Sequence, residues 1–252
     1  MEDGQGKQDL EEEYDALKRL NHPNIVRCYG IHNIEEKSTI SMVMEGNSYG
    51  SIEKLLEKKS PMLTVTLLKK FLLEVYNAMK YMHSVGIVHR DIKLENLIIM
   101  ADGMIRVIDF GLALVLPDRR ACIPSKRNLA NVAPEVYNSE ADATLASDLW
   151  SFGVLIVEML GTNGRLKDYH PHVEPKHVDS VYRTIGAASK TKYLPGVDGA
   201  CPVVDTLLQL DPITRADMVN EAAIEDLLST DDNINRKPKQ PTPVKPCEPV
   251  TS

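Results

Sequence analysis

The chain has 252 residues, enough for one large domain or two small ones whose core needs no disulfide or metal. Its 29 Lys and Arg stand against 36 Asp and Glu, and this net charge of −7, with no basic block, excludes nucleic acid and anionic membranes as expected partners. The four cysteines form no Cys-x-x-Cys pair, so neither a zinc site nor a redox dithiol is expected. The N-terminus lacks a signal-peptide pattern and the most apolar stretch, residues 150–161, is too short to span a bilayer, which predicts a cytoplasmic protein.

The first half of the chain predicts a helix, two strands and two further helices. The expected ranges are a helix over residues 8–20, strands over 25–31 and 39–44, a short helix over 51–59 and a long helix over 67–84. In the first helix, apolar residues recur three and four positions apart and acidic residues crowd the first turns, where the helix dipole favours them. Residues 4–7 are expected to be a flexible start, and residues 46–50 interrupt the pattern after the second strand.

The second half predicts one hairpin followed by a mainly helical body. Apolar runs over residues 96–100 and 104–108 flank Asp102-Gly103, a pair typical of tight hairpin turns. Residues 112–134 show no sustained period and are expected to form a long loop. The remaining helices are expected over residues 146–160, where the helix is apolar on most sides, and over 175–188, 202–210 and 214–228. From Asp231 the chain is rich in Pro and Lys, and this tail is expected to be extended or disordered.

Three short motifs follow one another in the middle of the chain. They are His89-Arg90-Asp91-x-Lys93-x-x-Asn96, Asp109-Phe110-Gly111 and Ala133-Pro134-Glu135. Together and in this order they resemble the signature of the eukaryotic protein kinase family. The resemblance covers about residues 10–228, and Lys93, two residues after Asp91, is similar to the serine/threonine branch of that family.

The resemblance implies an α+β, protein-kinase-like fold with a mainly helical C-lobe and an incomplete N-lobe sheet. Residues 1–44 would be the remnant of the N-lobe, with two strands and a helix that resembles the family's αC helix. Residues 45–228 would form the C-lobe, and residues 229–252 would form a Pro-rich, disordered tail.

By resemblance, four side chains would serve the transfer of the γ-phosphoryl group of ATP to Ser or Thr hydroxyls of a protein substrate. Asp91 would orient the substrate hydroxyl and accept its proton, and Lys93 would place a positive charge near the transferring group. Asn96 and Asp109 would hold Mg²⁺ with hard oxygen ligands. These residue types suit the chemistry, because phosphoryl transfer depends on positioning and charge neutralisation more than on covalent help.

The resemblance also implies how ATP would be held. The backbones of Glu45 and Asn47 would meet the adenine, and Ile98 would form the floor of its pocket. Met44 would be the gatekeeper residue before them, and Glu13 matches the glutamate of the αC helix. Each of these positions, taken alone, would also suit an ordinary core or turn residue.

Further positions match residues that hold the family's fold together. Asp148 resembles the aspartate that anchors the catalytic loop, and Arg215 resembles the arginine that pairs with Glu135. A buried pair of that kind leaves an uncompensated charge if one partner is removed. Cys28 stands where a larger apolar residue is expected, so the stack that joins the αC-like helix to Phe110 is expected to pack loosely.

The chain departs from the family pattern in two places. No Gly-rich loop and no strand lysine precede Glu13, which leaves a truncated kinase and a naturally degenerate kinase as alternatives. Asn128 stands where the family has a threonine before Ala133. We therefore expect weak nucleotide binding and slow or absent transfer; the alternative function is a non-catalytic, pseudokinase-like scaffold or binding protein.

Two candidates for regulation remain. Ser125 lies ten residues before Glu135, close to the family's activating phosphosite, where a phosphate could pair with Arg90; an ordinary loop serine is the alternative. The Pro-x-x-Pro spacings of residues 238–249 could dock in the aromatic groove of an SH3-type partner, but the same spacing is common in linkers.

Overall fold

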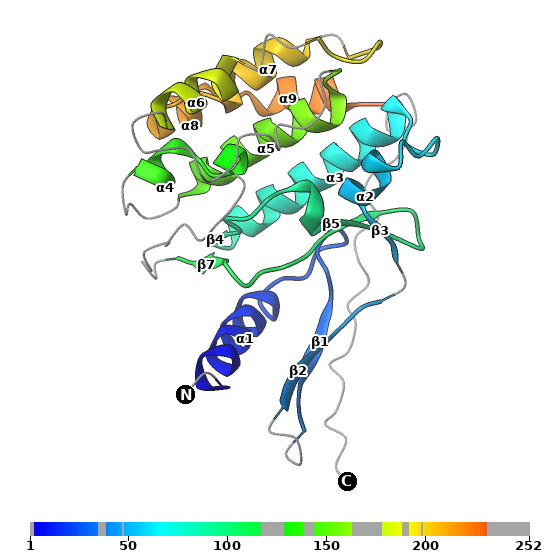
Figure 1. Cartoon of the computed structure of the whole chain (residues 1–252), viewed down its shortest axis with the longest axis vertical. Coiled ribbons are helices and arrows are strands. Elements are labelled where there is room, and N and C mark those ends of the chain that lie inside the picture. Colours follow the sequence, from blue (N-terminus) through cyan, green and yellow to red (C-terminus); the bar gives the residue numbers. More distant parts are fainter. Residues whose placement is uncertain are drawn as a thin grey trace.

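The computed structural model describes residues 3–34, 39–46, 48–116, 129–138, 144–162, 178–187, 192–197 and 199–230. In this part of the chain, a small β-hairpin and one helix lie at one end, layers of helices lie at the other, and short strands lie between them (Figure 1). The Pro-rich tail, Ser125, Asn128 and Asn47 lie outside the described residues.

The N-terminal end consists of helix α1 (Asp3–Leu17) and the hairpin of β1 (Cys28–Ile34) and β2 (Thr39–Met44). The helix begins earlier than predicted, so residues 4–7 are not a loose start but its first turns. Side chains four positions apart bridge these turns, with Lys7 4.0 Å from Glu11 and Gln8 donating to Glu12 at 3.0 Å. The strand prediction for residues 25–31 is shifted, because Ile25 forms only an isolated parallel bridge with Val107 and the strand starts at Cys28.

A second sheet joins the two ends of the molecule. Its strand order is β3 (Ser48–Ser51), β5 (Leu97–Met100) and β6 (Ile105–Val107), and the predicted hairpin of β5 and β6 is confirmed. Strand β3 was not predicted, since Ser-Tyr-Gly-Ser carries no alternation of apolar residues. Ser51 then caps helix α2 (Ile52–Glu57), its hydroxyl accepting from the Lys54 amide at 3.4 Å.

Helix α3 (Val65–Ser84) packs against this sheet, in contact with β6. Thr64 caps its first turn, and the predicted apolar stripe is buried, including Leu72, Val75 and Met79. The Glu74 carboxylate accepts a hydrogen bond from the Ile105 amide at 2.8 Å, and the Lys70 ammonium donates to the Gly103 carbonyl at 3.0 Å. Two successive turns of the helix are therefore hydrogen-bonded to the hairpin. The predicted long helix therefore fixes the position of the β5–β6 hairpin.

Helix α5 (Leu145–Leu160) is the centre of the helical layers, as its apolar sequence predicts, and is buried along nearly its whole length. It packs between α3 on one side and α7 and α8 on the other (Figure 1). The remaining elements are β4 (Ile87–Val88), β7 (Leu114–Val115), the 3₁₀ turns η2 (Leu94–Asn96) and η3 (Leu129–Asn131), α4 (Pro134–Asn138), α6 (Val178–Gly186), α7 (Ala200–Leu207), α8 (Pro212–Met218) and α9 (Glu221–Leu228). Strands β4 and β7 pair with each other, so the predicted loop over residues 112–134 carries short elements in its described parts.

The single helix predicted over residues 214–228 is wrong, because the segment forms two helices. Asp211 caps α8, accepting from the Thr214 amide at 2.7 Å, and Val219 is extended. Asn220 then caps α9, accepting from the Ala223 amide at 3.1 Å. Each helix thus begins at its own polar capping residue, although the apolar periodicity continues across the break between them.

Within the described ranges, every helix is too short or too polar to span a membrane.

Candidate active site

The loop after β4 is anchored by one buried carboxylate. Asp148, on α5, is fully buried and accepts the His89 and Arg90 amides at 2.9 Å each. It also faces Nε2 of His83 at 2.9 Å, a contact at the end of α3 that sequence reasoning missed. Burial opposes the ionisation of Asp148, but the hydrogen bonds from His83 and the loop outweigh it and lower the pKa of this carboxyl.

The anchored loop places Asp91 between two donors. The Lys93 Nζ atom lies 2.7 Å from Oδ2 of Asp91, and Nδ2 of Asn96 donates to the same oxygen at 3.0 Å. Asn96 also donates to the Asp91 carbonyl at 2.9 Å, which closes the loop on itself. The three residues predicted from the motif are therefore brought together, with Asp91 and Asn96 buried and Lys93 half-buried.

His89 fixes the shape of the loop through its ring. Its Nδ1 atom accepts the Asp91 amide at 3.2 Å and its Nε2 atom faces the Ile108 carbonyl at 3.2 Å, a pattern that fits the neutral ring with its proton on Nε2. Complete burial lowers the pKa of His89, although the nearby Asp148, Asp91 and Asp109 act in the opposite direction. The ring packs edge-on against Phe110, with their centroids 4.6 Å apart.

The β5–β6 hairpin brings Asp109 to the same end as Asn96. The Ile108 amide donates to the Asn96 carbonyl at 2.9 Å, and Leu97 pairs with Val107. Asp109 has a left-handed backbone with φ 65°, as does Arg90 with φ 67°, a conformation that is uncommon for residues other than glycine. Such backbone outliers concentrate at functional sites.

Helix α1 reaches this hairpin end through Glu13. Its Oε1 atom accepts the Phe110 amide at 3.0 Å, across 97 positions of sequence. The pKa of Glu13 is raised overall, mainly because the carboxyl is partly buried. The hydrogen bond from Phe110 acts in the opposite direction, and the nearby charge of Asp109 adds to the effect of burial. Among the described residues, Glu13 forms no ion pair, so its link to the site is this backbone contact.

Of the residues predicted to line the adenine pocket, Ile98 and Glu45 lie in the described part of the chain, on β5 and directly after β2. Ile98, half-buried, pairs with Ser51 on one side and Arg106 on the other. Glu45 follows β2, and its Oε1 atom accepts the Arg27 amide at 2.8 Å and Nε of Arg106 at 3.1 Å. Sequence reasoning missed Arg106, whose only signal was a charge inside an apolar strand.

The segment after the third motif is tied to the C-terminal helices. Arg215, fully buried on α8, donates to both carboxylate oxygens of Glu135, at 2.8 and 3.1 Å, and to the Ala146 carbonyl at 2.8 Å. Its guanidinium lies over the Trp150 ring, 5.3 Å from the centroid, and Trp150 donates to the Ala130 carbonyl at 2.8 Å. The predicted pairing of Glu135 with Arg215 is confirmed.

Comparison with known proteins agrees with this geometry. The protein kinase domain family matches residues 1–224. The chain belongs to the protein kinase family. Similar relatives include mitogen-activated protein kinase kinase kinase 5 of Arabidopsis thaliana, which is 34% identical over 156 residues, 60% of this chain and 22% of the relative.

Two longer alignments reach kinases of other organisms. The serine/threonine-protein kinase TOS3 of Saccharomyces cerevisiae is 28% identical over 232 residues, 82% of this kinase chain and 41% of the relative. The rat NUAK family SNF1-like kinase 2 is 29% identical over 224 residues, 88% of this chain and 34% of the relative. The kinase chain thus spans less than half the length of each of these relatives.

The donor set at the hairpin end of this kinase fits Mg²⁺ carried by a nucleotide. Nδ2 of Asn96 is engaged by Asp91, which directs the amide's oxygen away from that bond. Asp109 supplies a carboxylate directly after Ile108, whose amide donates to the Asn96 carbonyl. Mg²⁺ is commonly held by one or two such oxygen ligands together with substrate phosphates. Within the described ranges, no group of three or more His, Cys, Asp or Glu side chains could hold a metal by itself, so the phosphates would have to complete the coordination.

Proposed function

We propose that this chain is a serine/threonine protein kinase that transfers the γ-phosphoryl group of ATP to hydroxyl groups of a protein. The observation that carries the proposal is the arrangement at Asp91, whose carboxylate is fixed by Lys93 at 2.7 Å and Asn96 at 3.0 Å. A general base must be held within hydrogen-bond reach of the proton that it accepts. The buried Asp91 carboxylate, held by two donors, meets that need.

Asp91 orients the substrate hydroxyl and takes up its proton while the hydroxyl oxygen bonds to the γ-phosphorus. The bond from that phosphorus to the β–γ bridging oxygen breaks, and ADP leaves. Lys93 and Asn96 both engage Oδ2 of Asp91, so Oδ1 is the oxygen that faces the hydroxyl. Lys93 is only half-buried, and its charge next to Asp91 offsets negative charge on the transferring group.

Asn96 and Asp109 hold Mg²⁺ together with the phosphates of ATP, and the metal neutralises phosphate charge when it is bound. This assignment is supported by the β5–β6 hairpin, which places Asn96 and Asp109 at the same end. The Ile108 amide, next to Asp109, donates to the Asn96 carbonyl. At the other end of the nucleotide, the backbones of Glu45 and Asn47 meet adenine and Ile98 lies beneath it. The ion pair of Glu45 with Arg106 keeps that segment close to β6.

The experiment that tests the function offers the full chain, with Mg²⁺ and labelled ATP, a peptide library with Ser, Thr or Tyr as the acceptor. We expect slow labelling of Ser and Thr peptides, in keeping with the weak transfer predicted for a chain in which no Gly-rich loop or strand lysine precedes Glu13. The Asp91→Asn variant should lower that rate by about 10²–10⁴-fold, the usual contribution of a general base. The matched control is Asp217→Asn, which changes an exposed aspartate of α8, in the helical layers, and should leave the rate unchanged. Transfer to Tyr alone, or a rate that Asp91→Asn does not lower, would contradict the proposal.

A further inference from the structure

A cavity lies in the helical layers, where α2, the start of α3 and the end of α5 meet. This α2/α5 cavity has a volume of about 460 Å³, a size typical of ligand pockets. Its wall is mostly apolar, and the apolar side chains in it are Leu56, Leu63, Leu68, Met159 and Leu194. Asp91 and Asp109 do not line it, so the cavity is separate from the proposed catalytic site.

Lys59, in the wall of this cavity, has a backbone conformation that normally takes glycine. Helix α2 ends with the Ser60 amide donating to the Leu55 carbonyl at 3.0 Å and with the Lys59 amide donating to the Leu56 carbonyl at 2.9 Å. In this kind of helix ending, the residue after the C-cap is left-handed and is usually glycine. Lys59 occupies that position with φ 46°, which is uncommon for a residue that has a side chain. The chain therefore carries a lysine side chain beside the cavity at a conformational cost.

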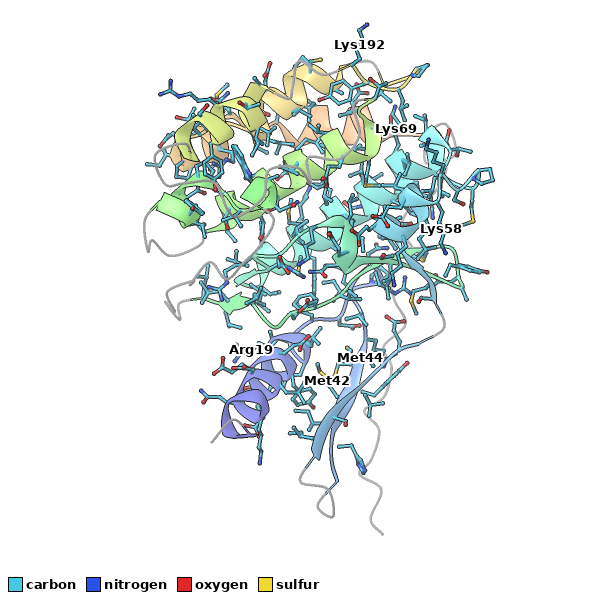
Figure 2. The ribbon with its side chains drawn as sticks, viewed as in Figure 1. Arg19, Met42, Met44, Lys58, Lys69 and Lys192 are labelled. Carbon is cyan, nitrogen blue, oxygen red and sulfur yellow. The ribbon has the colours of Figure 1, made fainter. Side chains whose placement is uncertain are left out.

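Four lysines around the cavity have unpaired ammonium groups. Within the part of the chain that the structure describes, no ion pair is formed by Lys58, Lys59, Lys69 or Lys192. Lys59 lines the wall and Lys58 precedes it, while Lys69 follows a lining residue of α3. The Lys192 carbonyl accepts the hydroxyl of Thr162, another lining residue, at 2.9 Å. Figure 2 shows Lys58, Lys69 and Lys192 on the side of the helical layers where α2 and α3 lie.

The carboxylates in the wall are already engaged. Glu57 and Glu158 also line the cavity, and each has an interaction partner within the chain. The charge that remains for a ligand is therefore positive, beside an apolar cavity. A ligand that matches both features carries an apolar group for the cavity and negative charges next to it. Because the four lysines come from three separate segments, an extended acidic peptide matches them better than a single carboxylate does.

We propose that the α2/α5 cavity and these four lysines are a docking site for a partner protein that presents an apolar side chain within an acidic, extended segment. The apolar side chain fills the cavity and supplies most of the binding energy, as buried anchors do at other interfaces. The acidic residues on either side of it pair with the lysines, which speeds association and rejects basic segments. The docking site does not depend on the proposed phosphoryl transfer, since it shares no residue with the transfer site.

The test measures the fluorescence anisotropy of the labelled peptide Gly-Glu-Glu-Leu-Phe-Glu-Glu-Gly during titration with the full chain, up to about 500 µM. We expect saturable binding by the parent. Binding should be about tenfold weaker or less for a peptide with Ser-Ser in place of Leu-Phe, and for the double variant Lys58→Glu with Lys59→Glu.

A second variant, Lys59→Gly, separates binding from folding. Glycine adopts the left-handed backbone without strain, so the unfolding temperature should stay the same or rise. Peptide binding should nevertheless weaken by about two- to fivefold, the usual effect of losing one exposed charge pair. Thermal unfolding and the anisotropy titration, carried out on the same preparation, give the two readouts.

The matched control is the double variant Lys7→Glu with Arg19→Glu, which makes the same change in net charge at exposed positions on and just after α1, and should bind the peptide as the parent does. Dodecanoate, an apolar chain with one carboxylate, is offered as a competitor. A parent that binds dodecanoate but not the peptide would overturn the proposal and give the cavity to a small amphiphile. Absence of any binding, or peptide binding that survives the Ser-Ser change or the Lys58→Glu, Lys59→Glu variant, would overturn it as well, as would loss of binding in the control.

Discussion

The loop that contains Asp91 is held by single side chains that accept hydrogen bonds from its backbone amides, which have no backbone acceptor among the described residues. Asp148 is the clearest case, because one buried carboxylate accepts two loop amides and faces His83. Glu13 does the same for Phe110 from the other end of the molecule.

Asp148→Asn should destabilise the fold by roughly 1–3 kcal/mol, because the amide's NH₂ group can accept nothing and leaves a buried donor unpaired. The measurement is the free energy of unfolding in urea. Asp217→Asn, at an exposed position of α8, is the control and should change it by less than about 0.5 kcal/mol. Equal effects of the two substitutions would show that the loop does not depend on the Asp148 carboxylate.

Glu13→Gln should change how stability depends on pH. The pKa of Glu13 is raised in the folded protein above its ordinary value of 4.5, so the folded state holds the proton more tightly than the unfolded state. The parent should therefore lose stability relative to the Gln variant as pH rises above 4.5, and the difference should level off at higher pH. Urea unfolding from pH 4 to pH 8, with the exposed Glu11→Gln as control, measures it; a difference that does not vary with pH would show that Glu13 titrates normally.

At the scale of elements, close packing of the central helix holds the layers together. Helix α5 touches α7 through Gly153, where an added Cβ would come within 2.8 Å of the Leu207 Cβ and 2.9 Å of Leu208 Cδ2. Gly153 is therefore required by space and not by backbone conformation.

Gly153→Ala should destabilise the fold by about 1–3 kcal/mol, the usual cost of overpacking a core. The matched control is Gly6→Ala, since Gly6 also lies in a helix but has nothing within 4 Å of an added Cβ. That substitution should stabilise the fold slightly, by up to about 1 kcal/mol, through helix propensity. Thermal unfolding of both variants checks the pair; stabilisation by both would mean that α5 and α7 lie further apart than described here.

Elements with strong periodicity could be predicted from sequence, and elements defined by polar caps or short pairing could not. The stripe of α3 and the continuous apolar run of α5 are signals that tertiary packing reinforces. The break between α8 and α9 depends on the Asn220 side chain accepting a backbone amide, which periodicity does not report. Strand β3 exists because β5 offers it an edge, a non-local cause that its own four residues do not carry.

At the scale of the whole molecule, the site joins segments that are far apart in sequence. The motifs predicted Asp91, Lys93 and Asn96 and the pairing of Glu135 with Arg215. They did not predict His83 beside Asp148 or Arg106 beside Glu45, because those contacts arise only when separate elements pack. Sequence motifs therefore named the chemistry, and the packing that holds it had to come from the structure.

Arg215→Met tests the longest of these connections. The substitution leaves the Glu135 carboxylate partly buried without its cation, and should destabilise the fold by about 3–5 kcal/mol. Arg183→Met, at an exposed position of α6, should have little effect on the free energy of unfolding. A double variant, Glu135→Gln with Arg215→Met, should recover part of the loss; no recovery would mean that the pair does not act as a unit.

The central claim is that Asn96 and Asp109 hold the metal–nucleotide complex while Asp91 acts on the acceptor hydroxyl. Calorimetric titration of the full chain with ATP, with and without Mg²⁺, tests this division most directly. The account predicts that Mg²⁺ strengthens ATP binding, that Asp109→Asn removes this gain, and that Asp91→Asn retains it. ATP binding that is indifferent to Mg²⁺, or that is lost in Asp91→Asn but kept in Asp109→Asn, would contradict the account.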